Sequence, residues 1–143
     1  MPYKFLEDVA IADVAFEATG KTLQELFESA GLAMTNTMVK KLSSLKPKVK
    51  KKIKIKSDNV ETLLFDFLQQ LVFFKDTEQL LFNKFEIEIT QKKNLWSASI
   101  LARGEKIDIK KHEMLVDVKG ATLHNYKVED TEEGWRTQVT LDV

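Results

Sequence analysis

The sequence predicts an α+β fold in a single domain, residues 1–143, with antiparallel sheets and two principal helices. Three observations lead to this prediction: an alternating segment near the N-terminus, two segments of helical periodicity in the first half, and a series of strand-like segments after residue 80. A length of 143 residues is enough for one hydrophobic core. The hydrophobic content of 43% with nine Phe fits a packed globule rather than a disordered chain.

The first third of the chain predicts a short β region followed by a helix. Residues 3–9 and 13–18 are expected to form two short strands or one bent strand, because apolar and polar positions alternate in the second segment. Gly20 then turns the chain. Thr22 and Glu25 have the spacing of a capping box, which indicates a helix start, and helical periodicity continues to about residue 40.

The middle of the chain predicts a second strand and helix. Residues 49–56 alternate Lys with apolar residues, as a half-buried strand does. Asp58 and Glu61 give a second cap-like pattern, and the expected helix covers about residues 59–75. Apolar residues are so frequent in this helix that most of its circumference must be buried.

The second half of the chain predicts consecutive antiparallel strands. The segment Gln-Lys-Lys-Asn at 91–94 is typical of a hairpin turn, and an acidic turn is expected at 129–134. Gly104 and Glu105 begin another connection, and a bulge is expected at Gly120. On a regular strand Lys119 and His124 would face opposite sides, whereas such a bulge would bring them to one face, and the sequence leaves both arrangements open. The expected strands cover residues 85–90, 95–103, 116–128 and 135–142.

The composition excludes several functional classes. The chain has no Cys, so disulfides, thiolate nucleophiles and Cys–zinc sites are ruled out. His112 and His124 are the only two His, neither has the context of a catalytic triad, and His112 is expected to be a solvated loop residue. No Gly-rich phosphate loop is present, so we expect a protein that is not an enzyme. The lack of a signal-peptide pattern and of a 20-residue apolar run predicts a cytoplasmic protein.

The Lys-rich segment 46–56 has two interpretations. It could contact phosphates, although the 22 basic and 22 acidic residues of the chain cancel and argue against a dedicated nucleic-acid binder. We favour a solvated edge strand, where Lys also discourages edge-to-edge pairing.

Asp13 and the last two residues, Asp142 and Val143, form the candidate metal site. Asp13 is an isolated acid in an apolar segment, and Asp142 with the terminal carboxylate of Val143 would end the last strand with two anionic groups side by side. A hard cation such as Ca²⁺ suits carboxylate and carbonyl oxygens. The alternative is that both Asp residues are ordinary exposed residues at strand positions in contact with water.

Taken together, these segments resemble the archease family over nearly the whole chain. The first half contributes Ala-Asp-Val at 12–14, Gly20, the Leu-rich start of the first helix at 23–27 and Leu-Leu-Phe-Asp-Phe-Leu at 63–68. The second half contributes Gly-Glu at 104–105, Lys-His-Glu at 111–113, Val-Lys-Gly-Ala-Thr-Leu-His at 118–124, Gly-Trp at 134–135 and Leu-Asp-Val at 141–143. Their order and spacing carry the resemblance, since no single motif decides it.

The resemblance implies an accessory protein of tRNA splicing. Archeases assist the RtcB-type ligase, which joins RNA ends bearing a 3′-phosphate with GTP and a divalent metal. An archease promotes guanylylation of the ligase and restores multiple turnover, and it carries a metal site described with calcium. That site maps onto Asp13, Asp142 and Val143. The resemblance implies neither membrane association nor sequence-specific binding of nucleic acid.

The chain departs from the family pattern at one place. Many members have His-Thr before the Ala-Asp that matches Ala12 and Asp13, whereas this chain has Ala10 and Ile11. A role of that His cannot be transferred, although Glu7 or Asp8 could lie nearby. Two other functions stay open: a chaperone-like interaction module without ligase specificity, and an RNA-binding protein that uses the Lys-rich segment. The metal could also serve only to clamp the C-terminal strand to the N-terminal strand.

Overall fold

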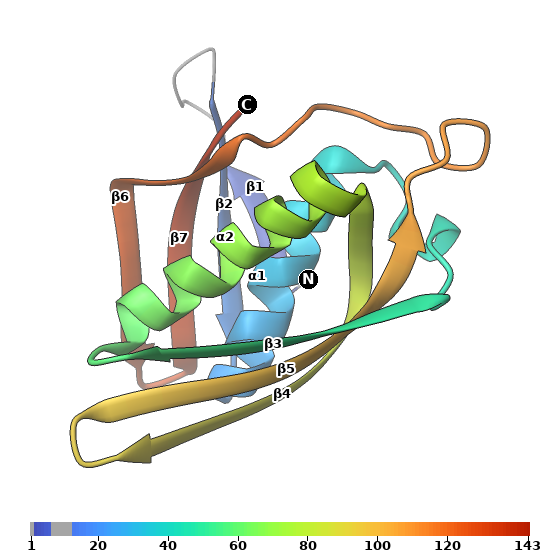
Figure 1. Ribbon diagram of the computed structural model, residues 1–143. Helices are drawn as coiled ribbons and strands as arrows, with labels where there is room; N and C mark the ends of the chain where they lie inside the picture. Colours follow the sequence, from blue (N-terminus) through green and yellow to red (C-terminus); the bar gives the residue numbers. More distant parts are fainter. Residues whose placement is uncertain (1, 7–12) are drawn as a thin grey trace.

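Two antiparallel sheets enclose two helices in the computed structural model, which describes residues 2–6 and 13–143 (Figure 1). One sheet has the strand order β1-β2-β7-β6 and the other has the order β3-β5-β4. The elements are β1 (Tyr3–Leu6), β2 (Asp13–Gly20), α1 (Leu23–Met38), β3 (Val49–Ser57), α2 (Val60–Glu78), β4 (Leu80–Lys92), β5 (Leu95–Lys106), β6 (Gly120–Thr131) and β7 (Gly134–Asp142), with a 3₁₀ turn at Leu42–Ser44. The predicted α+β class is confirmed.

The helices lie between the sheets, and each contacts both. Helix α1 packs against β2 and β4, and α2 packs against β3 and β6 (Figure 1). This position explains why α2 is apolar around most of its circumference: it has a sheet on two sides. The core is therefore shared between all layers, and it includes Phe16, Phe27 and Phe67 at 0% exposure.

The first helix starts as the sequence predicts. The Thr22 hydroxyl accepts a hydrogen bond from the Glu25 backbone N–H at 3.1 Å. The Glu25 carboxylate accepts in return from the Thr22 N–H at 3.2 Å, so the capping box is complete.

The second helix differs from the prediction at both ends. Its cap is Asn59 rather than Asp58, because the Asn59 side chain accepts from the Thr62 backbone N–H at 2.8 Å. The helix continues to Glu78 and ends where Gln79 adopts φ 57°, the left-handed conformation that terminates helices. The sequence offered no Gly at this position, so the expected helix stopped about one turn early.

The hairpin β4–β5 is confirmed and is longer than predicted. Its turn lies at Lys93, which has φ 55°. Strand β5 continues through Gly104 and Glu105, which the sequence placed in a connection. Gly104 is required there because a Cβ at that position would lie 1.8 Å from the Leu81 carbonyl oxygen.

The predicted bulge lies at the wrong residue. Residues 116–119 are not in a strand, and β6 begins at Gly120. The irregularity in the β6–β7 pairing occurs between Thr122 and Lys127, where Asn125 has φ 54°. Lys119 precedes the strand, so no bulge at Gly120 brings it to the face of His124. Within residues 2–6 and 13–143, no helix is both long and apolar enough to cross a membrane.

Candidate metal centre

Asp13 lies directly opposite Asp142 in the four-stranded sheet. Strand β2 begins at Asp13 and β7 ends at Asp142, and the two strands run antiparallel with these residues as partners. Residues directly opposite in an antiparallel pair have Cα atoms about 4.5–5.5 Å apart and side chains on the same face. The two carboxylates that the sequence singled out are therefore neighbours at one end of the sheet.

Val143 follows at the same end of the sheet. Its side chain is half-buried and packs against the hydrophobic core. This packing anchors Val143 directly after Asp142, at the end of the sheet where Asp13 and Asp142 are partners. The structure thus places all three predicted residues at one location.

The carboxylate pair has no ion-pair partner among the described residues. Like charges directly opposite each other on neighbouring strands destabilise a sheet. In the described part of the chain, no Lys or Arg forms an ion pair with Asp13 or Asp142. Two carboxylates and a main-chain oxygen are hard oxygen donors, which is the set that Ca²⁺ prefers, so these residues fit a calcium ion.

Side chains alone do not complete such a site. Across residues 2–6 and 13–143, no three His, Asp or Glu side chains gather in a way that could hold a metal ion. A cation held by Asp13 and Asp142 would therefore need a donor from the main chain, for which the sequence predicts Val143. Glu7, Asp8, Ala10 and Ile11, the positions of the departure from the family pattern, lie outside the described residues.

The third strand of the site, β6, holds Asp142 from the other side. Gly120 is the β6 partner of Asp142, and the Lys119 backbone N–H donates to the Asp142 carbonyl oxygen at 2.7 Å. The start of β6 is held in turn by α2, because the Ala121 N–H donates to the Gln69 side chain at 3.0 Å. Asp142 is thus fixed between two strands.

The long connection from β5 to β6, residues 107–119, is anchored along its length. Its backbone is tied to the end of α1, since the Leu115 N–H donates to the Met38 carbonyl at 2.8 Å. The buried ammonium of Lys75 in α2 donates to Asp117 at 2.6 Å, and Val118 is fully buried. These contacts fix the position of Lys119 beside Asp142.

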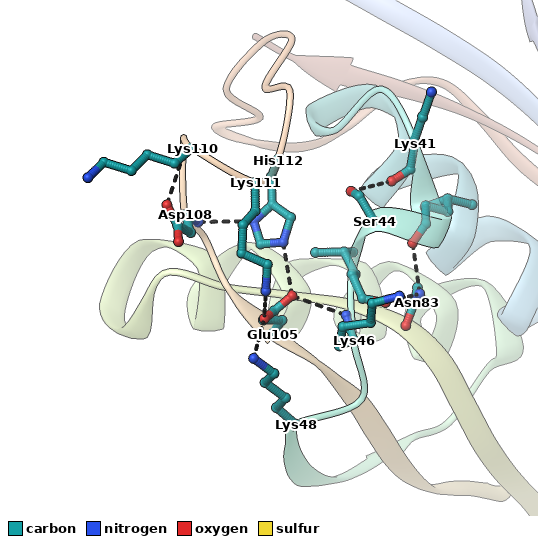
Figure 2. A network of polar contacts seen from close by, with 12 residues as sticks. Lys41, Ser44, Lys46, Lys48, Asn83, Glu105, Asp108, Lys110, Lys111 and His112 are labelled. Carbon is teal, nitrogen blue, oxygen red and sulfur yellow. Dashed lines mark hydrogen bonds and ion pairs between the residues drawn. The ribbon is translucent and has the colours of Figure 1, made fainter.

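The first anchor of this connection is a polar cluster around Glu105, which Figure 2 shows from close by. Glu105 is 6% exposed, and its carboxylate accepts from the Lys111 ammonium at 2.5 Å and from the Lys46 backbone N–H at 3.1 Å. Lys48 lies 3.3 Å away. The hydrogen bond from Lys111 is the largest influence and holds the pKa of Glu105 well below the usual value of 4.5, although burial opposes it.

His112 completes the cluster and corrects the prediction of a solvated loop residue. It is 1% exposed, and its Nε2 lies 2.9 Å from Glu105 Oε1 (Figure 2). Its Nδ1 accepts the Asp108 backbone N–H at 3.0 Å, so Nε2 carries the proton and donates to Glu105. The sequence motif Lys-His-Glu gave no sign of burial, because the partner that buries His112 lies on β5.

The fold and the site define a class: a small two-sheet α+β protein in which two carboxylates lie opposite each other at the start of β2 and the end of β7. The model of the Archease protein family matches residues 3–143. The chain belongs to the archease family.

Archeases from other organisms match this chain over almost their full lengths. The protein archease of Methanosarcina barkeri is 33% identical over 144 residues, covering 99% of this chain and 95% of the relative. That of Pyrococcus furiosus is 35% identical over 133 residues, covering 92% and 93%.

Two solved structures share the fold. The solution structure of protein 1598 from Methanobacterium thermoautotrophicum has a TM-score of 0.86 at 34% identity and covers 99% of both chains. The crystal structure of a Thermotoga maritima protein, described as an archease and possible chaperone, has a TM-score of 0.62 over 96% of this chain and 97% of that one. At 17% identity, this second likeness concerns the fold alone.

Proposed function

We propose that this chain is a non-catalytic, cytoplasmic activator of an RtcB-type RNA ligase, which promotes guanylylation of the ligase and its multiple turnover in tRNA splicing. Membership of the archease family supports the proposal. The observation that carries it is the register of Asp13 opposite Asp142, because an uncompensated pair of carboxylates is a structural cost that a cation removes.

In this proposal Asp13, Asp142 and Val143 supply oxygen donors to a divalent cation, with Ca²⁺ the best fit. The bound cation would neutralise the two carboxylates and present positive charge at the end of the sheet. Three protein donors fill only part of the 6–8 positions that Ca²⁺ prefers. The remaining positions are open to water or to oxygen groups of the ligase, which suits a transient complex rather than permanent storage of the ion.

The rigid surroundings of Asp142 support a positioning role. Its carbonyl oxygen is bound by the Lys119 N–H, and the connection that carries Lys119 is anchored to α1, α2 and Glu105. The backbone of Asp142 is therefore held in a fixed place before any partner binds, and preorganisation of this kind lowers the entropy lost on binding.

The experiment compares Asp13→Asn and Asp142→Asn with the wild-type protein. Calorimetric titration with Ca²⁺ measures binding, and transfer of labelled GMP to a purified RtcB-type ligase measures activation. We expect both variants to lose binding and activation together. Asp130→Asn is the matched control, because Asp130 is an exposed acid at the opposite end of the same sheet. If variants that bind no Ca²⁺ activate the ligase fully, the metal serves only to clamp β2 to β7.

A second candidate function is a chaperone-like interaction module. Several large apolar side chains are exposed, among them Ile109 at 83%, Leu123 at 72% and Phe73 at 52%. This candidate predicts that the protein suppresses aggregation of unrelated unfolded proteins without Ca²⁺, and that Ile109→Ser with Leu123→Ser abolishes the effect. Activation of the ligase by that double variant at wild-type level would separate the two functions.

A further inference from the structure

Strand β3 carries a continuous row of lysines on the solvent face of the three-stranded sheet. Lys50, Lys52, Lys54 and Lys56 occupy alternate positions of the strand and are exposed. Alternate residues of a strand share a face and lie about 6.6–6.8 Å apart, so the row is about 20 Å long. Strand β3 is at the edge of its sheet, and in Figure 1 it runs as the long green strand across the molecule.

The lysine row is not neutralised by the residues around it. Within the described residues, none of its four members takes part in an ion pair. Their partners on β5 are Arg103, Leu101, Ser99 and Ser97, which add a cation and no acid. The acids on this face, Glu86 and Glu88, belong to β4, whose backbone is two strands and therefore about 10 Å away. Glu86 pairs with Arg103, and Glu88 lines a hollow together with Lys54 and Lys56 but forms no ion pair with either, so the row keeps an excess of positive charge.

Lys51, on the same strand, is a lysine that takes part in packing and in an ion pair. It points to the opposite face, pairs with Glu78 at 2.9 Å and lies over the Phe74 ring at 5.8 Å from the ring centre. Because successive residues of β3 point to opposite faces, Lys51 packs against the protein while the four lysines of the row are exposed to solvent. Protection of an edge against pairing with another strand requires only one or two such charges.

We propose that the lysine row binds the phosphate backbone of single-stranded RNA without sequence preference. A straight row one lysine wide tracks a single strand, whereas a duplex presents two strands and calls for cations on a second line, where β5 offers only Arg103. A stacked strand has a phosphate about every 3.4 Å, so the row covers about six nucleotides with one lysine for about two phosphates. A hollow of about 400 Å³ beside the row is lined in part by Lys54, Lys56, Ser97 and Ser99, whose hydroxyl groups can donate to phosphate oxygens, and also by the acid Glu88.

The row is separate from the metal centre. It lies in the sheet β3-β5-β4, whereas Asp13 and Asp142 belong to the other sheet. Binding of the oligonucleotide is therefore independent of the proposed function, and only the choice of RNA over DNA rests on it.

The test is fluorescence anisotropy with a labelled oligouridylate of about 12 nucleotides, twice the length that the row covers. We expect wild-type binding to weaken with salt, with a slope of log K against log salt near about −2.8, since each of four phosphate contacts contributes about −0.7. The quadruple variant Lys50→Gln, Lys52→Gln, Lys54→Gln, Lys56→Gln should bind at least about tenfold more weakly and lose most of this slope. A control variant removes the same charge elsewhere: Lys4→Gln, Lys21→Gln, Lys41→Gln and Lys110→Gln, all exposed residues outside β3.

Three results would overturn the inference: no salt-dependent binding by the wild-type protein, equal losses in the β3 variant and the control, or tighter binding of polyglutamate than of RNA. Size-exclusion chromatography of the β3 variant detects edge-to-edge association. If the variant associates while its RNA binding is unchanged, the lysines serve only to protect the edge. Guanylylation of the ligase uses GTP and no RNA, so the β3 variant should stimulate that step as the wild-type protein does. If the wild-type protein does not stimulate guanylylation of the ligase, the proposed function is wrong. The anisotropy measurements still decide the RNA inference.

Discussion

His112 Nε2 lies 2.9 Å from Oε1 of Glu105 and joins the connection between β5 and β6 to the end of β5 (Figure 2). The same imidazole accepts the Asp108 backbone N–H through Nδ1, so both ring nitrogens are used inside the protein. The connection then leads to Lys119, whose N–H binds the Asp142 carbonyl oxygen. A contact remote from the carboxylate pair therefore helps to position it.

His112→Ala should lower the free energy of unfolding by about 1–3 kcal/mol, because it leaves the buried Glu105 carboxylate and Asp108 N–H with one partner fewer. It should also increase hydrogen exchange at the Lys119 amide and weaken Ca²⁺ binding while both Asp residues remain. Chemical denaturation and exchange measured by NMR test these effects. His124→Ala, at an exposed His of β6, is the control. Unchanged exchange at Lys119 would show that the other anchors suffice.

Glu105→Gln should change the pH dependence of stability. The pKa of Glu105 is lowered in the folded protein, foremost by the hydrogen bond from Lys111. Because the pKa is lowered on folding, the charged carboxylate stabilises the fold fully at pH values above its pKa in the unfolded chain, usually 4.5. This stabilisation is lost as the pH falls below that pKa. The difference in unfolding free energy between wild type and variant should thus be constant above about pH 6 and shrink from about pH 5 to pH 3. Glu133→Gln, which changes an acid in the exposed turn before β7, is the control.

Asp13→Asn and Asp142→Asn should each raise the melting temperature of the metal-free protein by about 1–4 °C, because each removes one member of a like-charge pair worth about 0.2–1 kcal/mol. In excess Ca²⁺ the order should reverse, since only the wild-type protein gains stability from binding. Melting curves with a chelator and with Ca²⁺ measure both effects. A variant that melts below the wild type in chelator would mean that the carboxylates do not repel each other.

Phe67→Ala should destabilise the protein by about 3–5 kcal/mol through the cavity that it leaves. Phe67 stacks on Phe27 with ring centres 5.7 Å apart and meets the Phe85 ring edge-on at 5.5 Å, so no neighbour can fill the space easily. Activation of the ligase should fall only in proportion to the folded fraction. Phe73→Ala on the same helix is the matched control, because Phe73 is 52% exposed and its loss should cost little. Urea denaturation compares the two.

The sequence predicted most of the fold because its signals are local. The capping box at Thr22, the alternation in β2 and the hairpin turn at Lys93 each depend on residues within a few positions. The meeting of Asp13 with Asp142 was also anticipated, since both stood out as acids at the ends of apolar segments.

The errors arose where a distant contact decides the structure. His112 is buried by Glu105 and the packing around it, which the motif Lys-His-Glu does not reveal. The bulge in β6 lies near Asn125 rather than Gly120, because Gly120 is needed as a regular partner of Asp142 while Asn tolerates the left-handed conformation. The lysine row was correctly placed on an edge strand, but only the sheet register shows that its neighbours on β5 carry no acid.

The arrangement of the four-stranded sheet has a consequence for biosynthesis. The strand that separates β2 from β6 is β7, which a ribosome makes after every other strand. Strand β3, helix α2 and the β4–β5 hairpin form a nearly contiguous unit that can pair as it emerges, but β2 must wait with only β1 as its neighbour. Incomplete chains therefore expose the long edge of β2 and the apolar side of α1, and nascent protein should depend on protection from aggregation until the last strand closes the sheet.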